Sequence, residues 1–359
     1  MKAATRGLQA LAVPIPFSTA MNFFERLTGF PERDYVQTRD QLEVVGKTLR
    51  SKVNGAAYGI GEFELVELGT LRDRVAKLGG PAGHPRVSVV QADVRVLHQA
   101  PEYKGALFQV ASQTNCLEMV GPDVTPEDGV TRYEHDRTQG PACAMAAGAA
   151  TIFRNYFVAV GEQQGQTAQH QLDGLADVGA ALSSALNRPA DTLWRTRNGY
   201  ALASREGLNL ITAHLGALDE QARDDLAGKL RIGIHRDVEV TYTPNRPGPN
   251  VSQAFCSALP VAYSGVAGTY WQPFAQFVLD AAYEATMLEA VLNAQRGASN
   301  VVLLTMLGGG AFGNDEEWIR AAIRRAVRKV LAFDLDVRLV SYRSPSSALR
   351  ALVQDLQAP

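Results

Sequence analysis

Cysteine is scarce in this chain, and long hydrophobic runs are missing. Three cysteines occur among 359 residues, an odd number at wide spacing, which argues against a disulfide framework and favours a reducing compartment. No run of about eighteen apolar residues occurs, so the sequence predicts no membrane-spanning helix. The apolar segment at residues 8–13 ends at Pro14, before it reaches the length of a secretory signal. We therefore expect a cytoplasmic protein with no membrane partner.

An excess of charge of one sign is also missing. The chain has 35 Lys and Arg residues against 37 Asp and Glu residues, a formal net charge of -2, which provides no overall field to attract a nucleic acid. The six histidines show neither an HExxH pattern nor a Cys/His zinc spacing, so we expect no metal. Hydrophobic residues make up 46% of the chain, as in a globular protein with a large core.

Residue patterns divide the chain into a short N-terminal part and a longer α/β core. Residues 1–80 are typical of short strands and turns with one helix, which we interpret as an extension packed on the core. Residues 81–359 form the predicted core, in which apolar runs at 87–94 and 106–111 indicate buried strands.

One helix and two insertions are expected in the middle of this core. Pro141 suits the first turn of a helix over residues 142–157, whose small residues allow close packing on a sheet. Insertions are expected near residues 187–207 and 231–263, the second as an added or edge hairpin.

The last hundred residues show the clearest alternation of helix and strand. Apolar residues from Phe274 to Leu292 recur at helical spacing, and residues 301–306 follow as a buried strand. A glycine-rich loop, a second amphipathic helix and a strand at 337–342 complete the series. This order predicts parallel strands with crossover helices, and hence a three-layer α/β/α fold around a mixed sheet.

The glycine-rich loop after the strand at 301–306 is the main candidate for ligand binding. It reads Gly308-Gly309-Gly310-Ala311-Phe312-Gly313-Asn314. Glycine has no Cβ and reaches positive φ, so the main-chain amides of such a loop can surround a phosphate. Asn314 and Glu317 predict a capping box for the next helix, whose first amides would point at the same anion. The alternative is a tight turn without a ligand.

This loop does not match two common nucleotide-binding motifs. It lacks the Lys-Ser or Lys-Thr pair of a Walker A motif, and it is not a clean GxGxxG fingerprint at the first strand of a dinucleotide domain. These absences argue against NTP hydrolysis and hydride transfer.

Two segments carry a resemblance to a known family. Residues 301–314, with their flanking helices and the strand at 337–342, resemble the second phosphate loop and last strand of a macrodomain. An earlier macrodomain strand ends at an Asn near the distal ribose, and residues 108–115, which end at Asn115, resemble it. Phe312 is similar in position to the aromatic residue that packs near that ribose in many members.

The resemblance covers about residues 86–342 and implies both a fold and a function. It implies a divergent macrodomain-like fold with an N-terminal extension and insertions. It also implies binding of ADP-ribose, or a related nucleotide diphosphate, and hydrolysis of an ADP-ribosyl linkage without a cofactor. The expected partner is ADP-ribose or an ADP-ribosylated substrate, and a nucleic acid is expected only as a modified substrate. The alternative is a non-catalytic reader of ADP-ribose.

Catalytic candidates lie in the charged segment that follows Asn115. Cleavage of an ADP-ribosyl bond passes through an oxocarbenium-like state, so a carboxylate can activate water, protonate the leaving group or stabilise charge. Glu118 is the first candidate because it lies three residues beyond Asn115, and Glu134 and Asp136 are the next. The amides of Gln139 and Gly140, at the expected helix start, offer a second anion site.

A third hypothesis is a Cys/His hydrolase. Cys116 adjoins Asn115 and could act as a nucleophile with His135 as its base. The competing interpretation is a small buried residue beside a strand end.

Overall fold

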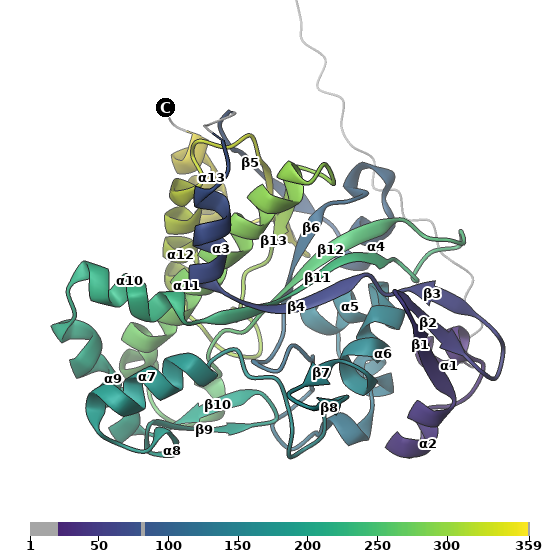
Figure 1. Ribbon diagram of the computed structural model, residues 1–359. Helices are drawn as coiled ribbons and strands as arrows, with labels where there is room; N and C mark the ends of the chain where they lie inside the picture. Colours follow the sequence, from purple (N-terminus) through teal and green to yellow (C-terminus); the bar gives the residue numbers. More distant parts are fainter. Residues whose placement is uncertain (1–20, 80–82, 358–359) are drawn as a thin grey trace, which may run out of the picture.

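A seven-stranded mixed sheet forms the centre of the computed structural model, which describes residues 21–79 and 83–357. The strand order is β4-β11-β12-β6-β13-β14-β5. In that order the strands are β4 (Glu62–Glu67), β11 (Arg231–Glu239), β12 (Asn250–Cys256), β6 (Leu107–Ala111), β13 (Val301–Leu304), β14 (Asp336–Ser341) and β5 (Arg86–Gln91). The strands from β12 to β5 run parallel, and β11 pairs antiparallel with both β12 and β4 (Figure 1).

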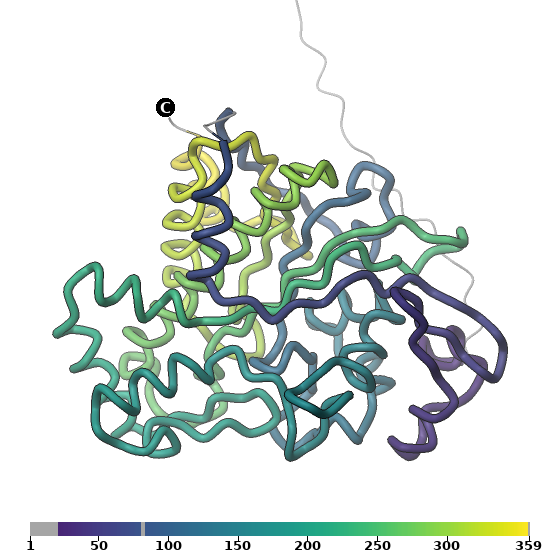
Figure 2. The backbone as a smooth tube through the Cα atoms, in the orientation of Figure 1, coloured from purple at the N-terminus to yellow at the C-terminus, as the bar shows by residue number. Residues whose placement is uncertain are grey.

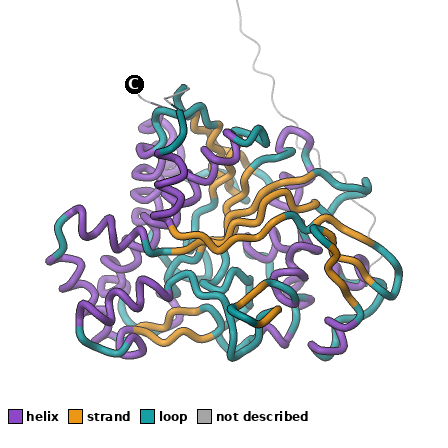
Figure 3. The backbone as a smooth tube through the Cα atoms, viewed as in Figure 1, coloured by secondary structure: helices purple, strands orange, loops and turns teal. Residues whose placement is uncertain are grey.

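Helices cover both faces of the sheet and give three layers. The hydrophobic cluster on one side of the sheet includes α3 (Leu68–Ala76), α7 (Ala176–Leu186), α9 (Arg205–Ala217), α10 (Glu220–Gly228), α11 (Gly268–Gln295), α12 (Glu316–Lys329) and α13 (Ser347–Gln357). The other face carries α4 (Val94–Gln99), α5 (Gln139–Ala146) and α6 (Gly148–Tyr156). Figure 3 shows the strands of the main sheet crossing the molecule between these helices. The predicted three-layer α/β/α fold is confirmed.

Successive side chains of β6 alternate between the two faces of the sheet, so this strand packs against both helical layers. Leu107 belongs to the hydrophobic cluster around α11, whereas Phe108 and Val110 belong to the cluster around α4 to α6. Gln109 turns towards α11, where its Nε2 donates to Thr286 Oγ1 at 3.1 Å. Successive side chains of a strand point to opposite faces, so this pattern follows from the pleat. β6 and β13 are parallel neighbours inside the sheet, as the sequence predicted.

The expected hairpin at residues 231–263 is not an addition at the edge. β12 pairs with β6 and β11 pairs with β4, so both strands lie inside the main sheet. Sequence periodicity shows that two strands form a hairpin, but it does not show what lies beyond each strand. The prediction of an added or edge hairpin was wrong.

The expected helix over residues 142–157 is two helices, α5 and α6, separated at Ala147. Residues after β11 cause the break. The amides of Thr241 and Tyr242 donate to the carbonyl oxygen of Ala146, and the hydroxyl of Thr241 accepts from the amide of Gly148 at 2.9 Å. These bonds replace helical hydrogen bonds at the junction. A segment of the chain far away in sequence therefore determines where α5 ends.

The N-terminal part forms a small layer of its own. It contains α1 (Phe23–Thr28), α2 (Tyr35–Asp40) and a sheet of β1 (Leu42–Val45), β2 (Thr48–Ser51) and β3 (Ala57–Gly59). A hydrophobic cluster joins this layer to α5 and α6. β4 and α3 belong instead to the main sheet and its helical layer, so the separate structure ends at β3. The apolar segment at residues 8–13 lies outside the described residues.

Smaller elements complete the chain. They are β7 (Ala159–Val160), β8 (Gln163–Gln164), α8 (Ala190–Leu193), β9 (Trp194–Arg197), β10 (Tyr200–Ala203) and the 3-10 helices Pro101–Tyr103, Pro126–Asp128, Thr131–His135 and Val261–Tyr263. Figure 2 shows the segment that contains α7 to α10 and the N-terminal layer at opposite ends of the molecule. No helix within residues 21–79 and 83–357 is long and apolar enough to cross a membrane.

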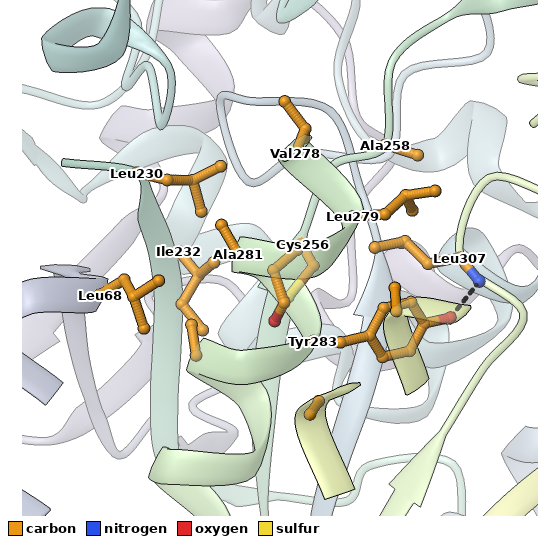
Figure 4. Packing of buried hydrophobic residues seen from close by; sticks show 14 of the residues in the cluster. Leu68, Leu230, Ile232, Cys256, Ala258, Val278, Leu279, Ala281, Tyr283 and Leu307 are labelled. Atoms are coloured by element: carbon orange, nitrogen blue, oxygen red, sulfur yellow. Dashed lines mark hydrogen bonds between the residues drawn. The ribbon is translucent and has the colours of Figure 1, made fainter. Parts of the chain in front are cut away.

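The hydroxyl of Tyr283 fixes the chain where β13 ends. This fully buried side chain of α11 donates to the carbonyl oxygen of Thr305 at 2.5 Å. It also accepts from the amide of Leu307 at 2.9 Å, the bond drawn in Figure 4. Both main-chain groups lie just before the glycine-rich loop, so the core determines where the loop begins.

Tyr283→Phe should lower the free energy of unfolding by about 1–3 kcal/mol, because it leaves buried main-chain groups without partners. Urea unfolding followed by circular dichroism measures the change. Tyr342→Phe is the control, since Tyr342 is 76% exposed. Equal stability of the two variants would contradict the role assigned to the Tyr283 hydroxyl.

Candidate functional site

A cavity of about 240 Å³ lies at the carboxyl ends of β6 and β13. It is lined by Ala111, Ser112, Gln113, Glu118, Met119, Val120, Asp136, Thr138, Gln139, Gly140, Pro141, Tyr200, Ala258, Tyr263, Thr305, Met306, Leu307, Gly308, Gly310, Ala311 and Phe312. Ligands of open α/β sheets bind at this edge, beyond the carboxyl ends of the strands. The cavity therefore brings together the loop after β6, the start of α5 and the glycine-rich loop.

The glycine-rich loop is folded by its own main chain and by neighbours. Gly309 donates to Met306, Gly313 donates to Gly310, and Asn314 donates to the carbonyl oxygen of Gly308 at 2.9 Å. Gly308 has φ 76°, and a Cβ there would collide with Ala258 and Asn314. Glycine is therefore required at this position for both conformation and space.

Three consecutive amides of this loop remain unpaired. The main-chain N–H groups of Gly310, Ala311 and Phe312 have no partner among residues 21–79 and 83–357. All three residues line the cavity, and a Cβ on Gly310 would meet no atom within 4 Å. A run of free amides beside a cavity is the arrangement that binds phosphate oxygens. Gly310 leaves space for such a group to approach the main chain.

The helix after the loop is capped differently from the prediction. Asp315, not Asn314, is the N-cap residue of α12, and its carboxylate accepts from the amide of Glu317 at 2.7 Å. The Asn314 side chain instead donates to the carbonyl oxygen of Leu259 at 2.8 Å. Asn314 is buried, and this bond ties the loop to the chain after β12. The expected capping box with Asn314 was wrong.

Gly309 and Gly313 do not line the cavity. A Cβ on Gly309 would approach Ile319 Cδ1 at 3.1 Å, so this residue faces α12. Gly313 has φ 70°, and a Cβ there would lie 3.0 Å from Ala262 Cβ. These two glycines shape the loop, whereas Gly308, Gly310, Ala311 and Phe312 face the cavity.

Three aromatic side chains form one wall of the cavity. The ring centroids of Tyr200 and Phe312 are 5.2 Å apart, and Tyr263 lies 5.2 Å from Tyr200 and 5.6 Å from Phe312. Tyr200 comes from β10, in the segment expected as an insertion, and its hydroxyl donates to the carbonyl oxygen of Met119 at 2.8 Å. Sequence analysis assigned no role to Tyr200 or Tyr263, because both reach the wall from distant segments.

Glu118 borders the cavity with a fully buried side chain. Its amide donates to the hydroxyl of Tyr133 at 3.1 Å, and its Oε1 accepts from Arg154 Nη2 at 3.2 Å. Its Oε2 has no hydrogen-bond partner among the described residues. Burial raises the pKa of Glu118 to about 7, against the lowering effects of Arg154 and Tyr133. A carboxyl group with this pKa can donate and accept a proton near neutral pH.

Arg154 of α6 is a site residue that sequence reasoning missed. Its side chain is fully buried, and its guanidinium lies 3.8 Å from the ring centroid of Phe255. A lone arginine among the small and apolar residues of the predicted helix at 142–157 was the available signal. Buried arginines need a partner, so this residue pointed to a buried acid nearby.

The start of α5 packs against the end of β6. Gln139 Oε1 accepts from the amide of Ala111 at 2.9 Å, and its Nε2 donates to the carbonyl oxygen of Gln109 at 2.8 Å. A Cβ on Gly140 would collide with the carbonyl oxygen of Ala111. Gln139 and Gly140 therefore line the cavity, but the Gln139 side chain is engaged with the strand.

The other two catalytic candidates have different surroundings. Asp136 lines the cavity, is partly exposed, and accepts from the amide of Thr138 at 2.8 Å. Glu134 does not line this cavity, and its Oε1 accepts from Arg26 at 3.1 Å and from the amide of Phe23 at 2.5 Å. These bonds tie Glu134 to α1 of the N-terminal layer.

Asn115 and the Cys116–His135 pair lie outside the cavity lining. Asn115 is fully buried, and its Nδ2 donates to Gln171 Oε1 at 2.8 Å. Burial raises the pKa of the Cys116 thiol well above its usual range, which disfavours the reactive thiolate. His135 is exposed and makes no hydrogen bond to this thiol among the described residues. The geometry does not support a Cys/His hydrolase.

A second cavity of about 800 Å³ adjoins the first. The two share Asp136, Thr138, Gln139, Thr305 and Met306 in their linings. The second is also lined by Ala92, Asp93, Val94, Arg95, Glu134, Arg137, Ala142, Met145, Val340, Ser341, Tyr342 and Arg343. Within residues 21–79 and 83–357, no group of three or more His, Cys, Asp or Glu residues could hold a metal ion.

Gly308→Ala should lower the free energy of unfolding by about 1–3 kcal/mol, because alanine disfavours positive φ and its Cβ has no space. Gly310→Ala is the matched control two residues away, where a Cβ meets open space. Urea unfolding compares the two variants. A destabilisation of the same size in both would show that the loop conformation differs from the one described.

Among known proteins, the chain is similar to several solved structures. No protein-family model matches the chain, and no curated protein matches it. Poly(ADP-ribose) glycohydrolase from Thermomonospora curvata is 11% identical, with 90% of this chain and 96% of that chain covered and a TM-score of 0.44. The same enzyme bound to the inhibitor ADP-HPD is 11% identical, with 89% and 96% covered and a TM-score of 0.42. Poly(ADP-ribose) glycohydrolase from Deinococcus radiodurans in complex with ADP-ribose is 14% identical, with 82% and 94% covered and a TM-score of 0.44.

Proposed function

We propose that the chain binds ADP-ribose, or a related nucleotide diphosphate, and hydrolyses an ADP-ribosyl linkage. The observation that carries this proposal is the run of amides at Gly310, Ala311 and Phe312 that have no partner within the described part of the chain, in residues that line the same cavity as Glu118. The amides suit a diphosphate, and the carboxyl group suits proton transfer at a glycosidic bond. The resemblance of the loop to a macrodomain phosphate loop supports the same assignment.

The two adjoining cavities suit the two ends of such a ligand. The diphosphate would lie at the Gly310–Phe312 amides, with the distal ribose in the 240 Å³ cavity beside the Phe312 ring. The nucleoside would occupy the 800 Å³ cavity, which is reached past the shared residues Thr138 and Met306. The ligand would thus extend along the carboxyl edge of the sheet.

Glu118 would transfer the proton in the reaction. Its protonated form would donate to the oxygen that leaves the distal ribose, and the resulting carboxylate would then accept a proton from the attacking water. Asp136 is the other acid in the same cavity and would stabilise positive charge on the ribose ring. We place this activity in the cytoplasm, since all three cysteines are free and buried.

Binding without hydrolysis is the second candidate function. It is favoured by the burial of Glu118, whose side chain is 0% exposed. A substrate would reach this carboxyl group only after neighbouring residues move. A reader would use the same loop and cavities and would leave the linkage intact.

Gly310→Val should abolish binding of ADP-ribose and leave the fold intact, because the new side chain would occupy the approach to the free amides and a Cβ at this position meets no atom within 4 Å. Isothermal titration of the parent and the variant with ADP-ribose measures the affinity, and thermal unfolding of the same samples checks the fold. Adenosine, which has no diphosphate, is the control ligand. A folded variant that binds ADP-ribose as tightly as the parent would overturn the phosphate assignment.

Glu118→Gln should lower the turnover of an ADP-ribosylated substrate by about 100-fold or more, since it removes proton transfer from a nearly isosteric side chain. Its affinity for ADP-ribose should stay within a few-fold of the parent value. Release of free ADP-ribose measures turnover. No turnover by the parent protein would leave the reader function, and full turnover by Glu118→Gln with loss in Asp136→Asn would move the role to Asp136.

The pH dependence of turnover should follow the Glu118 carboxyl group. Its raised pKa of about 7 means that the acid form, which donates the proton, is lost as the pH rises through 7. We therefore expect kcat to fall above about pH 7 with a tenfold loss per pH unit. A kcat that rises through this range would contradict general-acid catalysis by Glu118.

A further inference from the structure

The Arg154 guanidinium is held from several sides inside the molecule. Nε donates to the carbonyl oxygen of Cys116 at 3.1 Å, and Nη2 donates to Thr151 Oγ1 and to Glu118 Oε1, each at 3.2 Å. Nη1 lies 3.4 Å from His235 Nδ1. Each of these contacts is with a buried residue, so the guanidinium has one fixed position.

The contact between Arg154 and Glu118 involves a single carboxylate oxygen. On the opposite face of the sheet, Arg236 holds Glu289 with two parallel bonds, from Nε to Oε1 at 2.7 Å and from Nη2 to Oε2 at 2.8 Å. The two-bond form is the stronger and more specific one. Arg154 gives its other donors to Cys116 and Thr151, which leaves Glu118 Oε2 unpartnered among the described residues.

His235 supports this arrangement from β11. Burial and the neighbouring Arg154 charge both lower the pKa of His235 well below its usual value, so the ring is neutral. A neutral ring can accept from Arg154 at Nδ1, which assigns its hydrogen to Nε2. Phe63 and Phe153 pack against the ring and fix its plane.

We infer that Arg154 is a positioning residue, which holds one oxygen of Glu118, leaves the other available for proton transfer and sets the protonation of that carboxyl group. Neutral His235 helps to fix the guanidinium by accepting from Arg154 Nη1 at its Nδ1 atom. The inference rests on the proposed function in one respect, namely that Glu118 transfers the proton. The geometric part concerns only Arg154, Glu118 and His235.

The charged and titratable groups around Glu118 determine the direction of the effect. Arg154 faces it from α6, Tyr133 from the 3-10 helix, Cys116 from the preceding loop and Cys143 from α5. Arg154 is the only cation among them, and both thiols are neutral because burial raises the pKa of Cys116 and Cys143. Removal of Arg154 therefore removes the main force that opposes protonation of Glu118.

The test is a direct titration of the Glu118 carboxyl group in the full chain, without substrate. Infrared spectra of protein labelled with ¹³C at glutamate are recorded across pH, and the difference from Glu118→Gln isolates this group. Arg154→Met should raise the pKa of Glu118 by about one unit or more. Arg236→Lys is the control, because it alters another arginine–glutamate pair, between a partly exposed arginine next to His235 in sequence and a buried glutamate, and should leave the titration unchanged.

A second variant covers the case in which Arg154→Met fails to fold. His235→Leu keeps Arg154 and removes the acceptor that fixes it, so the pKa of Glu118 should shift in the same direction by a smaller amount. An unchanged titration in the folded variants overturns the positioning role, whatever the turnover. A shifted titration supports it even if the parent protein hydrolyses nothing, in which case the proposed hydrolysis alone fails.

Turnover gives a readout that a merely structural role would not move. In Arg154→Met the alkaline fall of kcat should move to higher pH together with the titration, and ADP-ribose affinity should stay within a few-fold. A loss of kcat with an unmoved pH profile would overturn the inference, because it would match a general loss of packing.

Discussion

The close approach of α5 to the end of β6 is the contact around which the candidate site is built. Only glycine fits at position 140, since any Cβ would collide with the carbonyl oxygen of Ala111. Beside it, the Gln139 side chain bonds the amide of Ala111 and the carbonyl oxygen of Gln109, as a neighbouring strand would. The helix start, the strand end and Glu118 are thereby held within one cavity wall.

The opposite wall is fixed at its ends and open in its middle. Tyr283 holds the chain at Thr305 and Leu307, and Asn314 holds it at Leu259. Between these anchors, Gly310 and Ala311 are exposed and their amides are unpaired among the described residues. Unpaired amides are tolerated where water or a ligand reaches them. A loop held at both ends presents these donors without rearrangement, which suits a ligand with fixed phosphate geometry.

Local sequence pattern was sufficient to predict the layers of the fold and the position of the glycine-rich loop. The apolar runs of β6 and β13 and the helical spacing of α11 predicted two parallel interior strands and the helix that covers them. The break at Ala147 and the interior position of β11 and β12 were missed, because each depends on contacts with residues far away in sequence. Asn314 was assigned to the wrong contact for the same reason, since its partner Leu259 lies 55 residues earlier.

Site residues could be predicted from sequence where a single segment supplies them. They could not be predicted where side chains from several distant segments meet. Glu118, Gly308 and residues 310–312 were singled out from sequence and line one cavity. Arg154 and Tyr200 were missed because their partners lie on other segments, and Asn115 was proposed as a ligand-binding residue but turns away from the cavity towards Gln171. Side-chain direction in an irregular loop is decided by tertiary contacts, which spacing does not contain.

The burial of Glu118 has two effects, because it raises the pKa of the carboxyl group and also separates the group from solvent. A carboxyl group on an exposed cavity wall would have an ordinary pKa and would be ionised at neutral pH. Enclosure raises the pKa to about 7 and keeps a proton available, but it also separates the group from solvent. Arg154 opposes the first effect with its charge and a single hydrogen bond, both of which lower the pKa of the carboxyl group. A ligand that fills the cavity excludes water itself and so preserves the low-dielectric surroundings on which this balance depends.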